Sequence, residues 1–212
     1  MHPVSARRAA HPGGFTLLEI MVALCILSTL LAVGVPKLSD WVAANRAANA
    51  VEFYADGLRQ AREQALSHNS ASRLVLTDNA QSQQMDWRID ICFPTPSLPC
   101  NDDTGVWSTP LAPASNDPAG ATGYKSLVRS ASALPPPSML SVSLTPAGAD
   151  QIYFTALGWV DQTVSPRLTR LSLAPAVAGR FPSAAVVVSL AGITTKCDPN
   201  ASAGDSRLCP PP

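Results

Sequence analysis

The sequence predicts an α+β protein in which one long N-terminal helix packs on an antiparallel β-sheet domain. The first observation is an apolar run from Phe15 to Val35. The second is a helical periodicity that continues to about Ser67. The third is strand-like alternation of apolar and polar residues over residues 68–212. One long helix followed by short strands is typical of the α+β class.

The composition allows one globular core and an additional apolar segment. The 212 residues are 46% hydrophobic and only 14% charged, and 20 of them are proline. The formal net charge is zero. Removal of residues 1–14 would take away Arg7 and Arg8 and leave a net charge of −2. Such a small charge gives no general attraction to nucleic acid or to anionic lipid.

The apolar run has the length of a membrane-spanning helix. It reads FTLLEIMVALCILSTLLAVGV and contains one charged residue, Glu19. A helix of this length is about 32 Å long, close to the thickness of the hydrocarbon core. Basic residues before the run predict a cytoplasmic N-terminus, so we expect residues 15–36 to cross the membrane and the chain after Pro36 to lie outside the cytoplasm.

Two simpler interpretations leave Glu19 unexplained. One is a secretory signal cut near Ala32-Val33-Gly34, and the other is an uncleaved membrane anchor. A carboxylate within lipid costs at least a few kcal/mol, so Glu19 indicates a function and a specific partner.

The residues around Glu19 resemble a known processing signal. Gly13-Gly14-Phe15-Thr16-Leu17-Leu18-Glu19 is similar to the signature of the type IV pilin-like family, a glycine before the cut and a glutamate four positions after the first apolar residue. The resemblance implies a leader at residues 1–14, cleavage between Gly14 and Phe15, and methylation of the Phe15 amine. It also implies that Glu19 pairs with the terminal amine of a neighbouring subunit, which agrees with the need of a buried carboxylate for a cation.

The partners and location follow from the same resemblance. They are prepilin peptidase, other pilin or pseudopilin subunits that meet the N-terminal helix, and the bacterial inner membrane before assembly. The chain would cross that membrane once, with its C-terminal domain in the periplasm, and would then enter a pilus or pseudopilus filament.

Residues 37–67 continue the helix in an amphipathic form. Asp56 and Arg59, and Arg59 and Glu63, have the spacing of helical ion pairs. Alanine dominates the apolar side, so the surface that covers it must approach closely. The expected apolar stripe consists of Trp41, Ala44, Ala48, Val51, Ala55, Leu58, Ala61 and Ala65.

Residues 68–212 predict a β-rich periplasmic domain. The stretch from Pro94 to Pro137 is rich in turn-forming residues and predicts long loops. Ala191-Gly192 predicts a hairpin turn. Strands are expected at Arg73–Thr77, Trp87–Phe93, Ser126–Arg129, Met139–Leu144, Gln151–Thr155, Leu168–Leu173, Ala184–Leu190 and Ile193–Cys197.

Four cysteines of this domain form two close pairs in the sequence, Cys92 with Cys100 and Cys197 with Cys209. An even number suits an oxidising compartment, and the spacings are not those of zinc sites. Four cysteines allow three pairings, of which the local one is expected because the separations are short. Each such bond would stabilise the domain by roughly 2–3 kcal/mol.

Within the pilin-like family, the domain resembles the GspH/FimT type of minor pilin and pseudopilin. The similarity lies in Ala61-Arg62-Glu63-Gln64-Ala65, in the segment from Ile152 to Trp159, and in the final strand with the cysteine-closed tail. The resemblance implies a minor pilin that acts in type IV pilus assembly, which the tail favours. The alternative is the minor pseudopilin of a type II secretion system.

No pattern of an enzyme, cofactor or metal site is found. His68 is the one histidine after residue 14, and we expect it to face the last carbonyls of the helix. Asp102-Asp103 lacks the alternating ligands of a calcium loop. A dedicated role in DNA binding is disfavoured, because Ile193 and Thr194 occupy positions where DNA-binding relatives carry basic residues, and only Lys196 and nearby Arg207 remain.

Overall fold

The computed structural model describes residues 14–101 and 103–210. The predicted leader therefore lies outside the described residues, except for Gly14. The chain divides into two compact units, with the boundary between Trp41 and Val42. We call residues 14–41 the anchor segment and residues 42–210 the globular unit.

One helix, α1, runs from Leu17 to His68 and confirms the long helix predicted from the sequence. Its end is capped in two ways. Asn69 takes a left-handed conformation with φ 46°, and the Ser70 N–H donates to the Ala65 carbonyl at 3.1 Å. His68 Nδ1 lies 3.1 Å from the Gln64 carbonyl, so this histidine does face the last turn as expected.

Each of the eight predicted strands is present, with ends that coincide with the predicted ones or differ by one or two residues. Between Pro94 and Pro137, where long loops were predicted, the described residues form the short strand β3 and the 3-10 helix η1 (Gly120–Thr122) and otherwise lie in loops and turns. The strands are β1 (Ala71–Asp78), β2 (Met85–Cys92), β3 (Leu127–Arg129), β4 (Leu140–Thr145), β5 (Gln151–Phe154), β6 (Arg170–Pro175), β7 (Ala184–Val188) and β8 (Thr194–Cys197).

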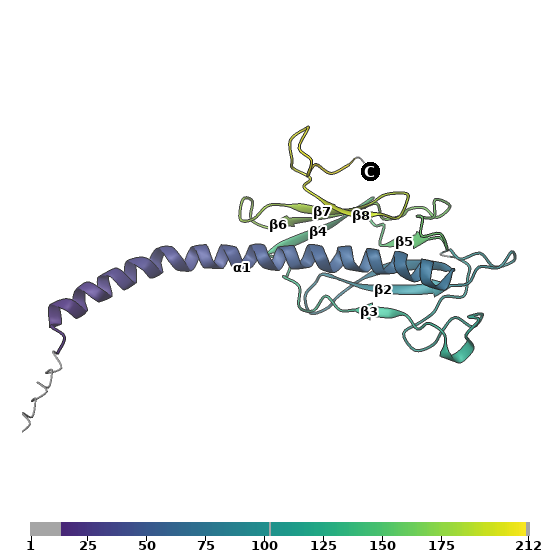
Figure 1. The fold of residues 1–212 in the computed structure, drawn as a ribbon, viewed down its shortest axis with the longest axis horizontal. Coiled ribbons are helices and arrows are strands. Elements are labelled where there is room, and N and C mark those ends of the chain that lie inside the picture. The colour runs from purple at the N-terminus through teal and green to yellow at the C-terminus, as the bar shows by residue number, and fades with distance from the viewer. Residues whose placement is uncertain (1–13, 102, 211–212) are drawn as a thin grey trace, which may run out of the picture. The chain divides into compact units, whose positions relative to one another are not determined.

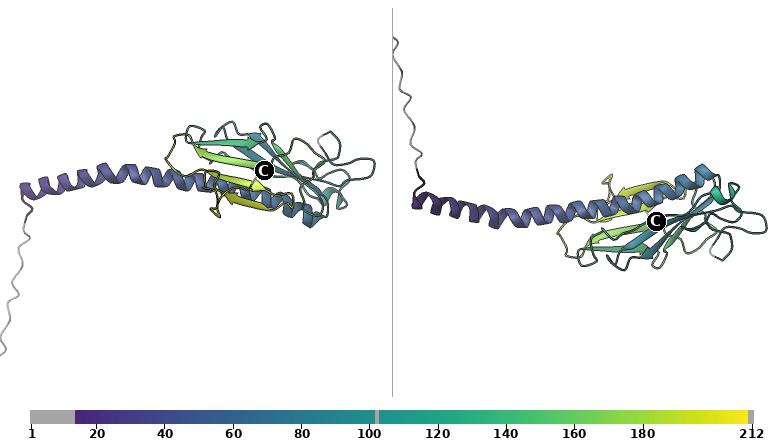
Figure 2. Two further views of the ribbon diagram at one scale, coloured as in Figure 1. Left: turned by 90° about the horizontal axis from the view of Figure 1, so that it is seen from above. Right: turned by 90° about the horizontal axis from the view of Figure 1, so that it is seen from below.

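The α+β class is confirmed, but the strands form two antiparallel sheets where the sequence predicted one. The first sheet has the order β3-β2-β1-β5 and the second the order β4-β6-β7-β8. Figure 1 shows β2 and β3 on one side of α1 and β6, β7 and β8 on the other, and Figure 2 shows the same ribbon from above and below. Local periodicity marks a strand but does not say which distant strand pairs with it.

The core lies where the two sheets meet the second half of α1. The Trp87 indole N–H of β2 donates to the Phe53 carbonyl of α1 at 3.0 Å, and the Met85 N–H donates to the Tyr54 hydroxyl at 3.2 Å. Burial raises the pKa of Tyr54 to about 12. A Cβ atom added to Gly57 would lie 3.0 Å from both Leu74 Cδ1 and the Trp87 ring. Helix and sheet therefore approach closely at Gly57.

The buried face of α1 is wider than the predicted stripe, and the stripe is wrong at its beginning. Trp41 and Ala48 are exposed and Ala44 is half-buried, whereas Ala43, Ala47 and Ala50 are buried in their place. Two sheets cover a broader arc of a helix than one sheet does. That arc also takes in Phe53 and Tyr54. From Val51 onward, the predicted apolar positions are buried.

A buried charge on the outer face of the first sheet was not predicted. Asp90 is completely buried and accepts hydrogen bonds from Arg73 at 2.9 Å and from Arg88 at 2.8 Å. The Arg73 guanidinium lies 4.3 Å from the ring centre of Trp107, in the loop region after β2. The two arginines make burial of the carboxylate tolerable, and Trp107 covers the group.

A substitution at Gly57 tests the close packing of α1. Gly57→Val should lower the free energy of unfolding by about 1–3 kcal/mol, because the added atoms collide with the Trp87 ring and with Leu74. The measurement is urea unfolding of the detergent-solubilised chain, followed by tryptophan fluorescence.

The matched control is Ala48→Val, on the exposed side of the same helix. It should change the free energy of unfolding by less than about 1 kcal/mol, since only helix propensity is altered. Equal effects of the two substitutions would contradict the close contact at Gly57.

Candidate functional site

The residues predicted to direct assembly lie at the start of α1. Phe15 and Thr16 precede the first helical residue, Leu17, and Glu19 is in the first turn. Thr16 caps the helix, because its side-chain Oγ1 accepts the Glu19 N–H at 3.2 Å. A carboxylate in the first turn is also favoured by the positive end of the helix dipole. The cap therefore uses the backbone N–H of Glu19, and the side-chain carboxylate is not needed for it.

Phe15 and Glu19 share one face of the anchor segment. Together with Ile20, Ala23 and Leu24, and with Leu27 one turn further on, they line a shallow apolar groove. The side chain of Phe15 is 79% exposed and Glu19 is exposed as well. The structure thus places the expected cleavage residue beside the expected pairing carboxylate, on a face that another apolar surface could cover.

The remainder of the anchor segment is exposed and apolar. All residues from Phe15 to Trp41 are exposed. Helix α1, which contains all of them from Leu17 onward, is the one helix of the described residues that is long and apolar enough to cross a membrane. Cys25, which has no disulfide, lies here too. This segment fits a protein that passes once through the inner membrane.

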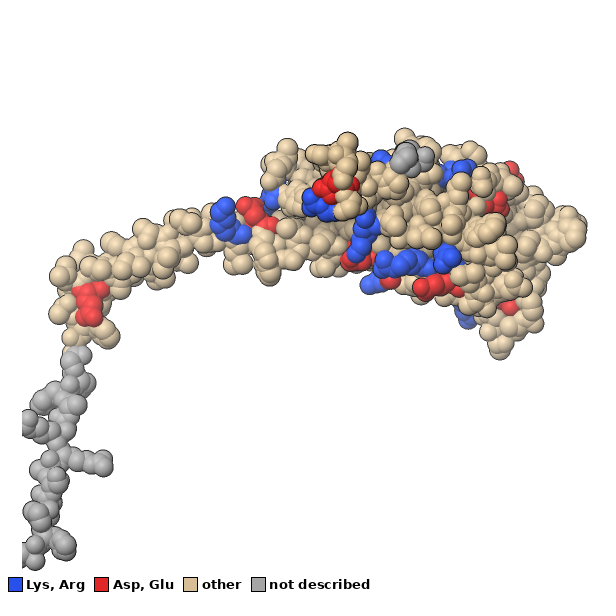
Figure 3. Space-filling model, turned by 45° about the horizontal axis from the view of Figure 1, so that its top comes forward, with Lys and Arg blue, Asp and Glu red and all other residues tan. Residues whose placement is uncertain are grey.

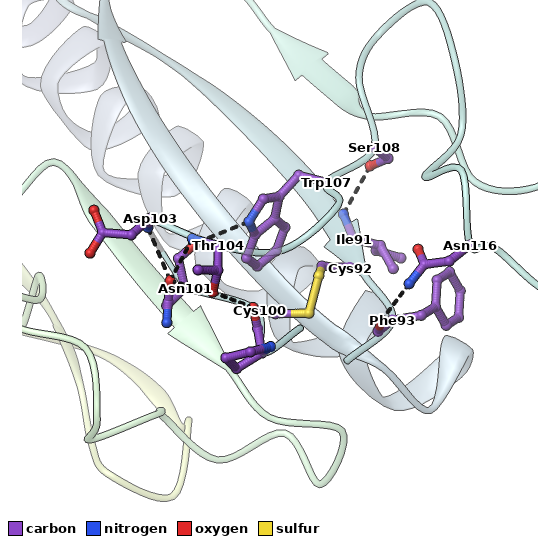
Figure 4. Close-up of a disulfide and its surroundings, with 11 residues drawn as sticks. Ile91, Cys92, Phe93, Cys100, Asn101, Asp103, Thr104, Trp107, Ser108 and Asn116 are labelled. Carbon is purple, nitrogen blue, oxygen red and sulfur yellow. Dashed lines mark hydrogen bonds between the residues drawn. A yellow bond between two sulfur atoms is a disulfide. The ribbon is translucent and has the colours of Figure 1, made fainter. Parts of the chain in front are cut away.

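The cysteines of the globular unit are joined in the local pairing, Cys92 with Cys100 and Cys197 with Cys209. The first bond closes a loop at the end of β2, shown in Figure 4. Nearby side chains hold the same region: Trp107 Nε1 donates to the Asn101 carbonyl at 3.2 Å, and Asn116 Nδ2 donates to the Phe93 carbonyl at 2.7 Å. The loop region after β2 is therefore tied to the sheet by a covalent bond and by several hydrogen bonds.

The second disulfide closes the tail that follows β8. Asp198 N–H donates to the Arg207 carbonyl at 2.7 Å beside this bond. The tail is polar and has little apolar surface of its own with which to fold. The covalent link therefore supplies much of what holds the tail next to the second sheet.

The two basic residues left for contact with DNA are both paired with carboxylates. Lys196 of β8 forms a salt bridge with Glu52 of α1, and Arg207 forms one with Asp205 at 2.8 Å. The Lys196 ammonium, which hydrogen-bonds to Glu52, lowers the pKa of that carboxyl. The Arg207 guanidinium lowers the pKa of Asp205 to about 2. Paired cations of this kind offer little counterion release to a polyanion.

Other charges of the globular unit also alternate in sign. Arg129 of β3 contacts Asp56 at 2.8 Å, and Arg59 lies 3.7 Å from both Glu52 and Asp56. The predicted pair of Asp56 with Arg59 is confirmed. Figure 3 shows a row of blue side chains on this surface with red side chains beside it.

The described residues contain no group of three or more His, Cys, Asp or Glu side chains placed to hold a metal ion. Asp102, one of the two aspartates considered for calcium, lies outside the described residues. His68 stacks edge-on against Tyr124, with ring centres 5.1 Å apart. The most distinctive chemistry of the described chain thus remains the carboxylate on the apolar helix.

Comparison with protein families gives two matches. Residues 43–192 match the family described as type II transport protein GspH, and residues 11–35 match the prokaryotic N-terminal methylation motif. Comparisons with curated proteins and with solved structures gave no match. The two family matches do not overlap, and the second includes Gly14, Phe15 and Glu19.

The family matches agree with the architecture of one long helix and two antiparallel sheets. The GspH match covers most of the chain, and the description of that family names a type II transport protein. A methylation motif at the start of the helix marks a substrate of prepilin peptidase that assembles with other pilins. The chain therefore belongs to the GspH family and is a type IV pilin-like protein of the minor pilin and pseudopilin type.

Proposed function

We propose that this chain is a minor pilin that prepilin peptidase processes and that acts in the assembly of a type IV pilus. The observation that carries the proposal is the position of Phe15 and Glu19 on one exposed apolar face of a helix of membrane-spanning length. The cysteine-closed tail after β8 supports the pilus over other machines, through its resemblance to subunits of pili.

In this proposal, residues 1–14 are a leader on the cytoplasmic side and residues 15–36 lie in the inner membrane. Cleavage after Gly14 creates a new amine at Phe15, which is methylated and keeps its positive charge. The Glu19 carboxylate of an adjacent subunit then neutralises that amine within the apolar filament core. An ion pair in such surroundings fixes the register of two helices, because any other register leaves a charge buried alone.

A second candidate is a minor pseudopilin of a type II secretion system, in a short periplasmic filament that moves folded proteins outward. The description of the matching family favours this candidate. Residues 37–67 would continue the helix into the periplasmic domain, residues 68–212, in both machines. A role in DNA uptake is less favoured, because Lys196 is already paired with Glu52.

Cleavage after Gly14 predicts the mass of the mature protein. Protein extracted from membranes should begin at methylated Phe15, as measured by intact-mass spectrometry. Gly14→Ala should leave much of the protein uncleaved, because a side chain at the cut opposes close contact with the peptidase. A mature wild-type chain that begins at Met1 or near Val35 would contradict this processing.

Glu19 should be needed for assembly but not for cleavage. The Glu19→Leu subunit should still be cleaved, so its mass should be that of the mature chain with this one substitution. Its amount in sheared filaments should fall at least tenfold, since the Phe15 amine of the neighbouring subunit loses its partner.

Glu63→Leu is the matched control, an exposed glutamate of the globular unit. It should enter filaments normally. If Glu19→Leu also enters them normally, Glu19 has no role in pairing.

Deletion of the gene separates the candidate machines. Surface pili, secreted hydrolases and natural transformation are scored in the same strain. We expect loss of pili with normal secretion, and restoration by the wild-type gene. Normal pili with enzymes retained in the periplasm would establish the secretion role instead, and loss of transformation alone would establish the DNA role.

A further inference from the structure

Five large apolar side chains are exposed together at the end of the globular unit where α1 finishes. They come from α1, from the turn after β5, and from the turn between β7 and β8. Their exposed fractions range from 44% for Leu66 to 65% for Leu157. The set, which we call the distal patch, consists of Leu66, Leu157, Trp159, Leu190 and Ile193.

Backbone hydrogen bonds join the two turns of the distal patch. The turn after β5 is closed by Thr155 N–H to the Trp159 carbonyl at 2.8 Å. The Val160 N–H donates to the Leu190 carbonyl at 2.9 Å, which connects this turn to the turn between β7 and β8. Residues that are about thirty positions apart in the sequence thus form one continuous surface.

Two glycines allow the turns to touch each other and the helix. Gly158 and Gly192 both have positive φ, 71° and 75°. A Cβ atom at Gly192 would lie 2.0 Å from the Gly158 carbonyl oxygen, and one at Gly158 would lie 3.1 Å from the Leu66 side chain. The Arg62 Nε–H donates to the same Gly158 carbonyl at 3.1 Å. The distal patch is therefore a preorganised surface, which lowers the entropy lost when a partner binds.

The chemistry of the distal patch fits a protein partner. An exposed apolar surface that includes a tryptophan, here Trp159, is typical of protein–protein contacts. The nearby guanidinium of Arg62 is hydrogen-bonded to the Gly158 carbonyl. Ile193 stands at a position where a nucleic-acid site would need a cation, so the patch does not suit nucleic acid. Leu66 of the patch lies about 36 Å along α1 from Val42, where the globular unit begins.

The size of the distal patch indicates which protein covers it. Five half-exposed side chains offer on the order of 400 Å², so two copies joined patch to patch would bury about 800 Å² in total, less than a stable complex normally buries. A partner that is already held nearby by helix packing needs no larger contact, because its effective concentration is high. Subunits that pack with parallel helices also meet through unlike surfaces.

We propose that the distal patch docks the globular domain of a different pilin-like subunit, the one that follows this chain along the filament. This docking rests on one part of the proposed function, which is that the chain enters a filament through α1. It applies equally to a pilus and to a pseudopilus. It places the chain below another subunit and not at the exposed tip.

Photochemical cross-linking in cells tests the docking. The full-length chain carries benzoylphenylalanine in place of Trp159, and in a matched control in place of Leu111, which is 87% exposed in the loops after β2. After irradiation, adducts are purified and identified by peptide mapping. We expect Trp159 to link to the globular domain of a different subunit that carries a methylated N-terminus. The yield of this adduct should be at least tenfold lower from position 111. It should fall equally for the Trp159 probe when Glu19→Leu keeps the chain out of the filament.

The same surface is tested by Leu157→Asp with Trp159→Asp, against Leu111→Asp. Because all three side chains are exposed, the midpoint of thermal unfolding should change little. The double variant should reduce recovery of the partner subunit in filaments at least tenfold, and Leu111→Asp should not. A processed wild-type chain in filaments with no adduct at position 159, or with adducts only to DNA, to lipid or to a second copy, would overturn the proposal.

Failure of this inference is distinguishable from failure of the proposed function. Loss of pili on deletion, with no adduct at position 159, would leave the pilus role standing and refute the docking. Retained pili with defective secretion, and an adduct to a pseudopilin, would refute the pilus role and support the docking.

Discussion

The contact of Gly57 with the Trp87 indole sets the distance between α1 and the first sheet, and the globular unit is arranged around that distance. A small residue at the contact lets the indole reach the helix backbone, where it donates to the Phe53 carbonyl. Alanines on the same face, such as Ala50, Ala61 and Ala65, extend the close approach along the helix. Because the small residues of α1 allow a sheet to lie close to the helix backbone, both sheets can pack on this helix.

Charges at the outer edges of both sheets complete this arrangement. Lys196 reaches from β8 to Glu52, and Arg129 reaches from β3 to Asp56, so one edge strand of each sheet is joined to the same stretch of α1. Exposed pairs of this kind contribute little energy individually. Their effect here is on the orientation of α1 about its axis. They keep the polar face of the helix toward solvent and the alanine-rich face toward the core.

The two proposed contacts of the chain differ in physical type. Glu19 is a charge on an apolar helix and requires one particular cation, which suits a contact that defines register. The distal patch is apolar and rigid, and it gains stability from the area that it buries. Together they would hold one subunit at both ends of the same helix, and this is how small interfaces add up in a filament.

The sequence by itself determined the helix, the eight strands, the methylation motif and the unusual Glu19, because each is written in residues that are neighbours along the chain. It could not show that the strands divide between two sheets, that Asp90 is buried between two arginines, or that Ala47 and not Ala48 faces the core. These features, like the hydrogen bond between Val160 and Leu190, depend on contacts between distant segments. The periodicity of a segment records that one of its faces is covered, and only the tertiary structure decides what covers it.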